Sequence, residues 1–227
     1  MTDRPEVIAR ADGVLGEVAL RRRPGPVHEL IINGVFLMDT SETSTERLLA
    51  DILLAGQPRR VLVAGLGLGC TLAALLADSQ LAQVDVVEIE PLLVEWLRAG
   101  MVPGADQPLA DPRVQVQIAD IRDVLPAAPP EAYDAVVLDV DNGPGFLVHD
   151  RNAEVYSGDS LASAARALRP GGLLAVWSAA PAPDLHAALT AQVGPTEQVV
   201  YFVEHPGRTL DYYIYLSTRN RARATGS

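Results

Sequence analysis

A glycine-rich turn between two apolar segments constrains the fold of this chain more than any other feature. Residues Val61–Ala64 have the length and side-chain branching of a parallel strand that is covered on both faces. They are followed at alternate positions by Gly65, Gly67 and Gly69, which lack a Cβ and so let the backbone turn sharply and approach a ligand closely. A second apolar segment, Val84–Glu88, ends in a carboxylate about 20 residues on, where doubly wound folds bind ribose hydroxyls. The pattern predicts an α/β fold with a pocket for a nucleoside-bearing cofactor.

The spacing of the glycines distinguishes between kinds of cofactor. A dinucleotide fingerprint is G-x-G-x-x-G, whose third glycine permits close packing of the following helix. Here the glycines follow G-x-G-x-G, and Cys70 stands where the longer motif would still run. The shorter pattern resembles the first motif of class I S-adenosylmethionine-dependent transferases, so we expect S-adenosylmethionine as the cofactor.

Composition narrows the chemistry and the partners. The 227 residues fit one α/β domain with a small additional element, and a hydrophobic content of 48% is enough to fill a core. The chain has no apolar stretch near the roughly 18 residues of a membrane span. Its net charge of −11 disfavours nucleic acid as a partner. All 18 basic residues are arginine, which excludes lysine Schiff-base and general-base chemistry.

The cysteine count and the N-terminal residues indicate the cellular compartment in which the protein is expected. A single cysteine excludes an internal disulfide and a thiolate metal cluster, and it suits a reducing compartment. Residues 2–6 are polar, and no apolar segment of the kind found in a signal peptide follows them. We therefore expect a cytoplasmic protein without a metal site.

Helices and strands alternate beyond residue 60, as in a doubly wound fold. Further strands are expected at Val114–Asp120, Tyr133–Asp139 and Leu173–Trp177, and the second of these is almost wholly apolar and therefore central. Residues 197–204 and 211–217 predict a closing antiparallel hairpin. The expected helices are Ser44–Ala55, Pro91–Ala99, Asp159–Leu168 and Pro183–Val193.

Three parts are expected along the chain. Residues 1–43 form a small β element, in which Gly16–Arg22 pairs with Glu29–Leu37 as a hairpin. Such a hairpin is not stable alone, so it must dock on the main domain or on a second subunit. Residues 44–218 form the cofactor-binding domain, and residues 219–227 form a flexible tail.

Taken together, the motifs resemble those of the spermidine synthase family, the aminopropyltransferase branch of the class I methyltransferase superfamily. The resemblance is carried by Asn33–Phe36, by the glycine turn and by Asp111–Val114, and it extends over residues 14–217. It implies a Rossmann-like class I methyltransferase fold, with a mostly parallel sheet, a C-terminal antiparallel hairpin and a preceding N-terminal β-hairpin. It also implies a homodimer.

The same resemblance assigns a set of cofactor contacts. Glu88 would bind the ribose hydroxyls, and Asp120 would accept a hydrogen bond from the adenine amino group. Asp120 has an alternative role as the N-cap of the turn that follows it. The full set of expected cofactor-binding residues is Gly65, Gly67, Gly69, Glu88, Asp120 and Ile121.

A second set of residues would hold the acceptor. Asp139 ends an apolar strand, where a carboxylate is costly unless it is used or paired. The resemblance makes it the catalytic residue that orients and deprotonates the nucleophile. Asp141, Asn142 and His149 are candidates for the acceptor pocket, although Asp and Asn in such a loop also serve only to shape turns.

Several positions depart from the aminopropyltransferase pattern. The aspartate of the family's glycine loop is replaced by Leu68, and the second acid of the loop after the fourth strand is Asn142. Ser44–Glu46 stands in place of a Tyr-His-Glu motif. Carboxylates pair the ammonium groups of a polyamine, and an unpaired buried ammonium is strongly penalised.

These departures favour an S-adenosylmethionine-dependent methyltransferase of spermidine synthase-like type, acting on a small acceptor such as an amine. The first alternative is a polyamine aminopropyltransferase that uses decarboxylated S-adenosylmethionine. Two further alternatives are a non-catalytic cofactor-binding protein and intramolecular chemistry on the cofactor's own methionine chain.

Overall fold

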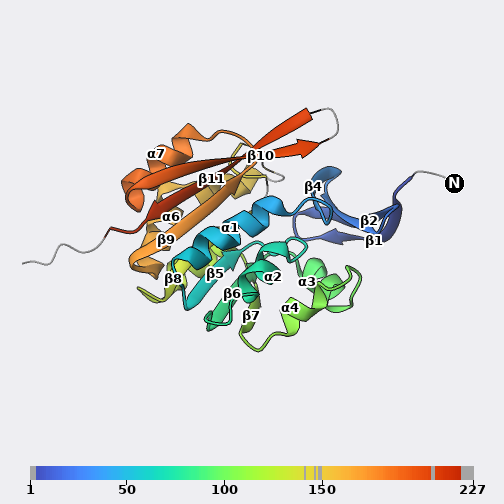
Figure 1. Ribbon diagram of the computed structural model, residues 1–227, viewed down its shortest axis with the longest axis horizontal. Helices are drawn as coiled ribbons and strands as arrows, with labels where there is room; N and C mark the ends of the chain where they lie inside the picture. The colour runs from blue at the N-terminus through green and yellow to red at the C-terminus, as the bar shows by residue number, and fades with distance from the viewer. Residues whose placement is uncertain (1–3, 141, 146, 148–149, 206–207, 221–227) are drawn as a thin grey trace, which may run out of the picture.

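Two β-sheets of unequal size organise the chain (Figure 1). The computed structural model describes residues 4–140, 142–145, 147, 150–205 and 208–220. The strands of the larger sheet are β5 (Arg60–Ala64), β6 (Gln83–Glu88), β7 (Val114–Ile118), β8 (Tyr133–Leu138), β9 (Leu168–Ser178), β10 (Thr196–His205) and β11 (Arg208–Thr218). Their order is β10-β11-β9-β8-β5-β6-β7. Strands β5 to β9 run parallel, and β11 is antiparallel to both of its neighbours, β9 and β10.

Side chains of the central strands alternate between two hydrophobic cores, one on each face of this sheet. On β5, Val61 and Val63 enter the core covered by α1–α4, whereas Leu62 and Ala64 enter the core covered by α5–α7. Burial on both faces explains the continuous apolar sequence of this strand. The helices are α1 (Ser44–Ala55), α2 (Cys70–Leu76), α3 (Pro91–Arg98), α4 (Asp106–Ala110), α5 (Ile121–Ala127), the 3₁₀ helix η1 (Asp150–Tyr156), α6 (Gly158–Ala167) and α7 (Pro183–Gln192).

The N-terminal residues form a four-stranded antiparallel sheet at one end of the molecule (blue in Figure 1). Its strands pair in chain order and are β1 (Glu6–Gly13), β2 (Gly16–Arg23), β3 (Val27–Ile32) and β4 (Val35–Asp39). This sheet docks through Val18, Leu20 and Leu30, which join the core covered by α1–α4. The Val14 N–H also donates to Glu90 Oε2 at 2.7 Å.

The small sheet is larger than the expected hairpin because the second expected strand is divided. Asn33 and Gly34 have φ values of +52° and +76°, which is the two-residue turn that connects tight hairpins. The segment expected as Glu29–Leu37 therefore becomes β3 and β4. The first strand, β1, was not predicted.

The predicted fold class is confirmed, with a mostly parallel sheet, a closing antiparallel hairpin and an N-terminal β element. As predicted, β8 is the central strand, and α1 begins and ends at the predicted residues. The short helix α5 was not predicted, and it contains Pro126, which argues against a helix in sequence. The division into three parts stays a prediction, and residues 221–227 of the expected tail lie outside the described residues. Within the described ranges, no helix is long and apolar enough to cross a membrane.

Candidate active site

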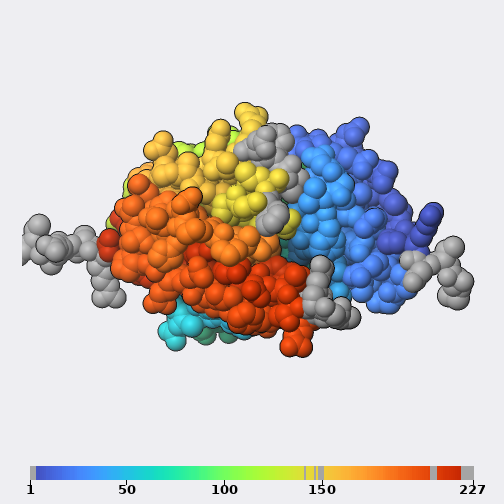
Figure 2. All heavy atoms as spheres, turned by 90° about the horizontal axis from the view of Figure 1, so that it is seen from above, coloured from blue at the N-terminus to red at the C-terminus, as the bar shows by residue number. Residues whose placement is uncertain are grey.

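A cavity of about 480 Å³ opens at the carboxyl ends of β5, β6 and β8. The chain leaves β5 toward β6 on one side, and β8 flanks β5 on the other, which is the switch point where open α/β sheets bind ligands. The N-terminal sheet and α1 supply further wall residues, among them Leu30, Met38 and Glu46. Figure 2 shows the N-terminal segments (blue) and the C-terminal segments (orange and red) on one face, with yellow segments between them.

The glycine turn lies tightly between β8 and β4. A Cβ added to Gly65 would lie 2.1 Å from the Asp139 carbonyl oxygen, and one added to Gly67 would lie 2.7 Å from Met38 Sδ. Both glycines line the cavity. Gly69 has a φ of +81° and caps the start of α2, outside the set of residues that line the cavity.

Glu88 lines the cavity at the end of β6 and is 6% exposed. Its Oε2 accepts from the Leu66 N–H at 2.7 Å, and its Oε1 accepts from the Glu90 N–H at 2.8 Å. Burial raises the pKa of Glu88, while these backbone donors act in the opposite direction. The carboxylate is therefore held rigidly against the glycine turn, at the place where a ribose contact is predicted.

Asp139 lies directly after β8 and lines the cavity. Its Oδ2 accepts from the Thr71 hydroxyl at 3.1 Å. Burial, with a further contribution from the like charge of Glu46, raises the pKa of Asp139 to about 7. Such a carboxyl group exchanges a proton near neutral pH, which suits a general base.

Two residues of this site were missed at the sequence level. Thr71 lies on the first turn of α2, where nothing in its sequence surroundings distinguishes it. Glu46 lines the cavity from α1, accepts from the Thr45 hydroxyl at 2.6 Å, and has a pKa raised by burial. A signal for Glu46 was present, since it matches the glutamate of the Tyr-His-Glu motif otherwise replaced by Ser44–Glu46.

The cavity is strongly acidic. None of its lining residues is arginine or histidine, as far as the structure describes the chain. Eight carboxylates line it: Asp39, Glu42, Glu46, Glu88, Glu90, Asp120, Asp139 and Asp211. Two of these, Asp39 and Asp120, pair with arginines that lie outside the lining set. In the described part of the chain, the other six carboxyl groups form no ion pair.

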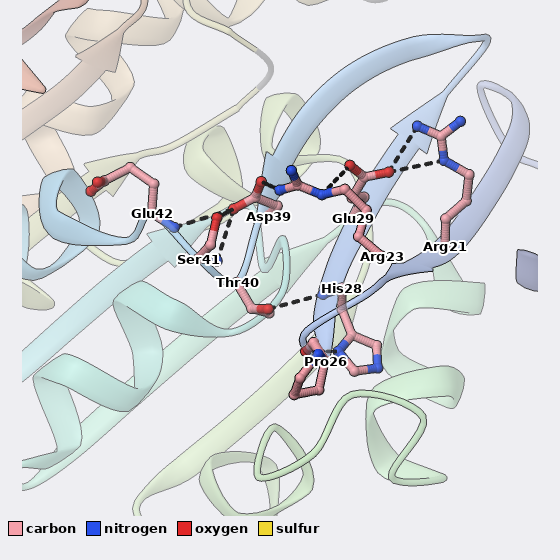
Figure 3. A network of polar contacts seen from close by, with 9 residues as sticks. All are labelled: Arg21, Arg23, Pro26, His28, Glu29, Asp39, Thr40, Ser41 and Glu42. Carbon is pink, nitrogen blue, oxygen red and sulfur yellow. Dashed lines mark hydrogen bonds and ion pairs between the residues drawn. The ribbon is translucent and has the colours of Figure 1, made fainter. Parts of the chain in front are cut away.

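Asp39 is held by a polar network at the end of β4 (Figure 3). The Arg23 guanidinium lies between Asp39 and the buried Glu29, and its Nε is 2.7 Å from Glu29 Oε1. Asp39 Oδ1 accepts from the Ser41 N–H at 2.8 Å. Glu42, by contrast, directs its carboxylate away from this network.

Asp120 and Ile121 line the far side of the cavity, at the start of α5. Asp120 is the N-cap of α5, since its Oδ1 accepts from the Arg122 N–H at 2.9 Å. The Arg122 side chain also pairs with it and lowers the pKa of Asp120. The alternative role as a cap therefore describes this residue, while its contact with adenine stays a prediction.

The expected acceptor residues are only partly described. Asn142 lines the cavity, and its Nδ2 lies 3.5 Å from the Phe36 carbonyl oxygen on β4. Asp141 and His149 lie outside the described residues. Two aromatic residues, Trp177 and Tyr212, also line the cavity, and their rings stack with centroids 5.4 Å apart.

The seven-stranded sheet and the cavity at its switch point define a Rossmann-like protein of the class I methyltransferase fold. A model of the spermine/spermidine synthase domain matches residues 16–204, and the chain belongs to that family.

Relatives with curated names agree with this assignment. Spermidine synthase 1 of Pisum sativum is 33% identical over 148 residues, which are 64% of this chain and 42% of that protein. Polyamine aminopropyltransferase of Mycobacterium tuberculosis (strain ATCC 25618 / H37Rv) is 31% identical over 177 residues, 77% of this chain and 33% of that protein. The chain thus spans less than half the length of these relatives.

Solved structures show the same fold. Spermidine synthase from Thermotoga maritima superposes with a TM-score of 0.79 at 16% identity, covering 96% of this chain and 74% of that one. A spermidine synthase in complex with the transition-state analogue AdoDATO gives a TM-score of 0.81, also at 16% identity, covering 96% and 75% of the two chains. The homodimer and the cytoplasmic location stay predictions.

The expectation of methyl transfer from S-adenosylmethionine is wrong. The family model and the relatives named as aminopropyltransferases contradict it and favour the alternative. The physical argument failed at Leu68, whose side chain is 3% exposed and packs in the core instead of lining the cavity. An apolar residue there says nothing about the charge that the cavity accepts. Carboxylates also line the cavity from β4 and α1, at Asp39 and Glu46.

Proposed function

We propose that this chain transfers an aminopropyl group from decarboxylated S-adenosylmethionine to a primary amine of a polyamine-like acceptor. The observation that carries the proposal is the cavity wall, which has eight carboxylates and, in the described part, no basic residue. The donor carries a sulfonium and an ammonium group without a carboxylate, and a diamine carries two ammonium groups. Both reactants match an anionic cavity, whereas intact S-adenosylmethionine adds a carboxylate among like charges.

The half of the cavity formed by Glu88, Asp120 and Ile121 is proposed to hold the nucleoside. Glu88 is oriented by the Leu66 and Glu90 N–H groups, so its position does not depend on the ligand. An ordered carboxylate at this point favours charge-assisted hydrogen bonds to ribose hydroxyls. When bound, decarboxylated S-adenosylmethionine would supply the transferable group and a neutral thioether as the leaving group.

Asp139 is proposed as the general base. Asp139, whose raised pKa of about 7 lets it take up a proton near neutral pH, accepts a proton from the acceptor ammonium group and frees the nitrogen lone pair. The nitrogen attacks the carbon next to sulfur, a C–N bond forms as the C–S bond breaks, and the electron pair of the broken bond stays on sulfur. Thr71 fixes one oxygen of this carboxylate by its hydrogen bond of 3.1 Å, which contributes to alignment of the reactants.

Glu46 is proposed to bind an ammonium group close to Asp139. Its side chain lines the cavity and has no ion-pair partner among the described residues. Burial raises its pKa in the absence of ligand, and a bound cation would favour the ionised form. The stacked Trp177 and Tyr212 rings give a second surface on which a cation is stabilised.

The proposal is tested by incubating the protein with putrescine and either decarboxylated or intact S-adenosylmethionine, with products identified by mass spectrometry. We expect spermidine and 5′-methylthioadenosine from the decarboxylated donor, and no methylated amine from the intact one. Asp139→Asn should lower kcat by roughly 10²- to 10⁴-fold, the usual contribution of a general base. Asp159→Asn, at an exposed position on α6 outside the cavity, is the matched control and should leave kcat unchanged. Methylated putrescine, or no transfer from either donor to any of several amines, would contradict the proposal.

A further inference from the structure

We propose that Arg122 is a positioning residue, which fixes η1 against the nucleoside end of the cavity through Asp120 and thereby sets the affinity for the nucleoside. The inference rests on the proposed function only for the identity of that nucleoside. It also gives Asp120 an anchoring role in place of the adenine contact that the family resemblance implies.

Arg122 occupies the acceptor positions of the Asp120 carboxylate. Its backbone N–H and its Nε donate to Oδ1 at 2.9 and 3.0 Å, and its Nε and Nη2 contact Oδ2 at 3.0 and 2.5 Å. The single hydrogen on Nε is shared between the two oxygens, so three hydrogens are donated and about one of the four lone-pair positions of the carboxylate is left for a ligand. Asp120 therefore lines the cavity as the acidic partner of an ion pair with Arg122.

The remaining nitrogen of the same guanidinium reaches η1. Arg122 Nη1 donates to the Arg151 carbonyl oxygen at 3.2 Å and to Glu154 Oε2 at 2.5 Å. Only an arginine can join a carboxylate, a backbone carbonyl and a second carboxylate in one planar group. A single side chain thus supplies polar contacts to both the start of α5 and η1, beside the apolar contacts of Ile121 and Val155 in the shared core.

The segment held in this way forms part of the cavity wall. Asn152 and Val155 of η1 both line the cavity, and Asn152 is only 6% exposed. At its other end η1 is tied to the catalytic strand, since the Tyr156 hydroxyl donates to the Val140 carbonyl oxygen at 2.7 Å. Displacement of η1 at the Arg122 contact would therefore move side chains that line the cavity next to Asp120.

The chain contains a matched control for this arrangement. Asp111 and Arg113 form the same local fork two residues apart, with Arg113 N and Nε both bound to Oδ1 at 2.9 and 3.0 Å, and Nη2 bound to Oδ2 at 2.8 Å. Arg113 also binds backbone carbonyls, those of Asp78 and Leu76, at 2.7 and 2.8 Å. Neither member of this second fork lines the cavity, so removing it tests the loss of a fork without any change at the nucleoside site.

The experiment measures binding of 5′-methylthioadenosine, the thioether left after aminopropyl transfer, by calorimetry on the full chain. We expect Arg122→Gln, Asp120→Asn and the double variant each to weaken binding by about tenfold, because the two side chains act as one unit. Arg122→Lys, which keeps the charge but not the fork, should restore only part of the affinity. Arg113→Gln should lower the melting temperature and leave the Kd unchanged.

Kinetics separate positioning from catalysis. With putrescine and the decarboxylated donor, Arg122→Gln should raise the KM for the donor and leave the KM for the acceptor and kcat near the wild-type values. If Arg122→Gln fails to fold, Glu154→Gln changes only an exposed side chain and should still weaken binding by about threefold, the effect of losing one charged hydrogen bond at the surface.

Three results would overturn the inference. The first is a wild-type protein that does not bind the thioether, and the second is an Asp120→Asn variant that loses affinity while Arg122→Gln does not. The third is an equal loss of affinity in Arg122→Gln and Arg113→Gln. An inactive protein that still shows the expected binding pattern would refute aminopropyl transfer and leave the role of Arg122 standing. The two hypotheses therefore fail separately.

Discussion

The close approach of the glycine turn to the end of β8 predicts a large effect of Gly65→Ala. Gly65 has a φ of +94°, and an added Cβ would lie 2.1 Å from the Asp139 carbonyl oxygen and 3.0 Å from its carbonyl carbon. Because both of these atoms belong to the backbone, no side-chain rotation relieves the overlap. The carboxyl ends of β5 and β8 must separate.

The magnitude follows from what that separation breaks. A non-glycine residue at positive φ costs about 1–2 kcal/mol. Separation of the strand ends also weakens the hydrogen bond of 2.9 Å from the Asp139 N–H to the Ala64 carbonyl oxygen, which joins the end of β8 to β5. This bond contributes about 1 kcal/mol, so the free energy of unfolding should fall by about 2–3 kcal/mol. For a chain of this length, that loss lowers the melting temperature by roughly 4–12 °C.

The assay is thermal and urea-induced unfolding of the variant beside Gly104→Ala. Gly104 has a φ of +82°, and an added Cβ there meets no atom within 4 Å, so only the backbone cost of about 1 kcal/mol should remain. Gly65→Ala should also lose most of its transfer activity, because Asp139 moves with its carbonyl group. Equal destabilisation in the two variants would refute the reasoning from close approach.

Three further outcomes are expected. The transfer rate should rise with pH through about 7 as Asp139 ionises, and Glu46→Gln should move this midpoint to lower pH because it removes a like charge; an unchanged midpoint would refute the coupling. Burial, with smaller effects of Glu46 and Asp139, raises the pKa of Cys70 to about 12, so alkylation by iodoacetamide at pH 8 should be roughly a thousandfold slower in the folded than in the urea-unfolded protein, as mass spectrometry would show. Since Trp177 lines the cavity and Trp96 does not, binding of 5′-methylthioadenosine should change tryptophan emission in Trp96→Phe but not in Trp177→Phe, and the reverse pattern would place the ligand elsewhere.

The parts of the site that follow buried strands could be predicted from sequence. A strand covered on both faces leaves an uninterrupted apolar run, and a carboxylate directly after such a run is conspicuous, as at Asp139 and Glu88. The glycine turn was equally visible, because only glycine fits where the backbone meets Asp139 at this distance. These residues lie on elements whose neighbours are fixed by the alternation of strands and helices.

The other half of the cavity could not be predicted in the same way. Asp39 is the last residue of β4, Glu42 lies in the link to α1, and Glu46 lies on the first turn of α1. They face the cavity only because the small sheet docks on the main domain. Local sequence does not specify this docking. The expectation for Leu68 failed as well. Its position in the glycine turn suggested a ligand contact, but its side chain is part of the core.

The hydrogen bond between Val14 and Glu90 has a consequence for how the protein is made. The two residues are 76 positions apart, so on a ribosome that adds 5–20 residues per second the β1–β2 turn waits about 4–15 s for its partner. During that interval Val18, Leu20 and Leu30 lack the part of their core that follows Glu90, which includes Leu93 and Leu97. The small sheet emerges before the residues on which it docks, and slower elongation prolongs its exposure to chaperones and proteases.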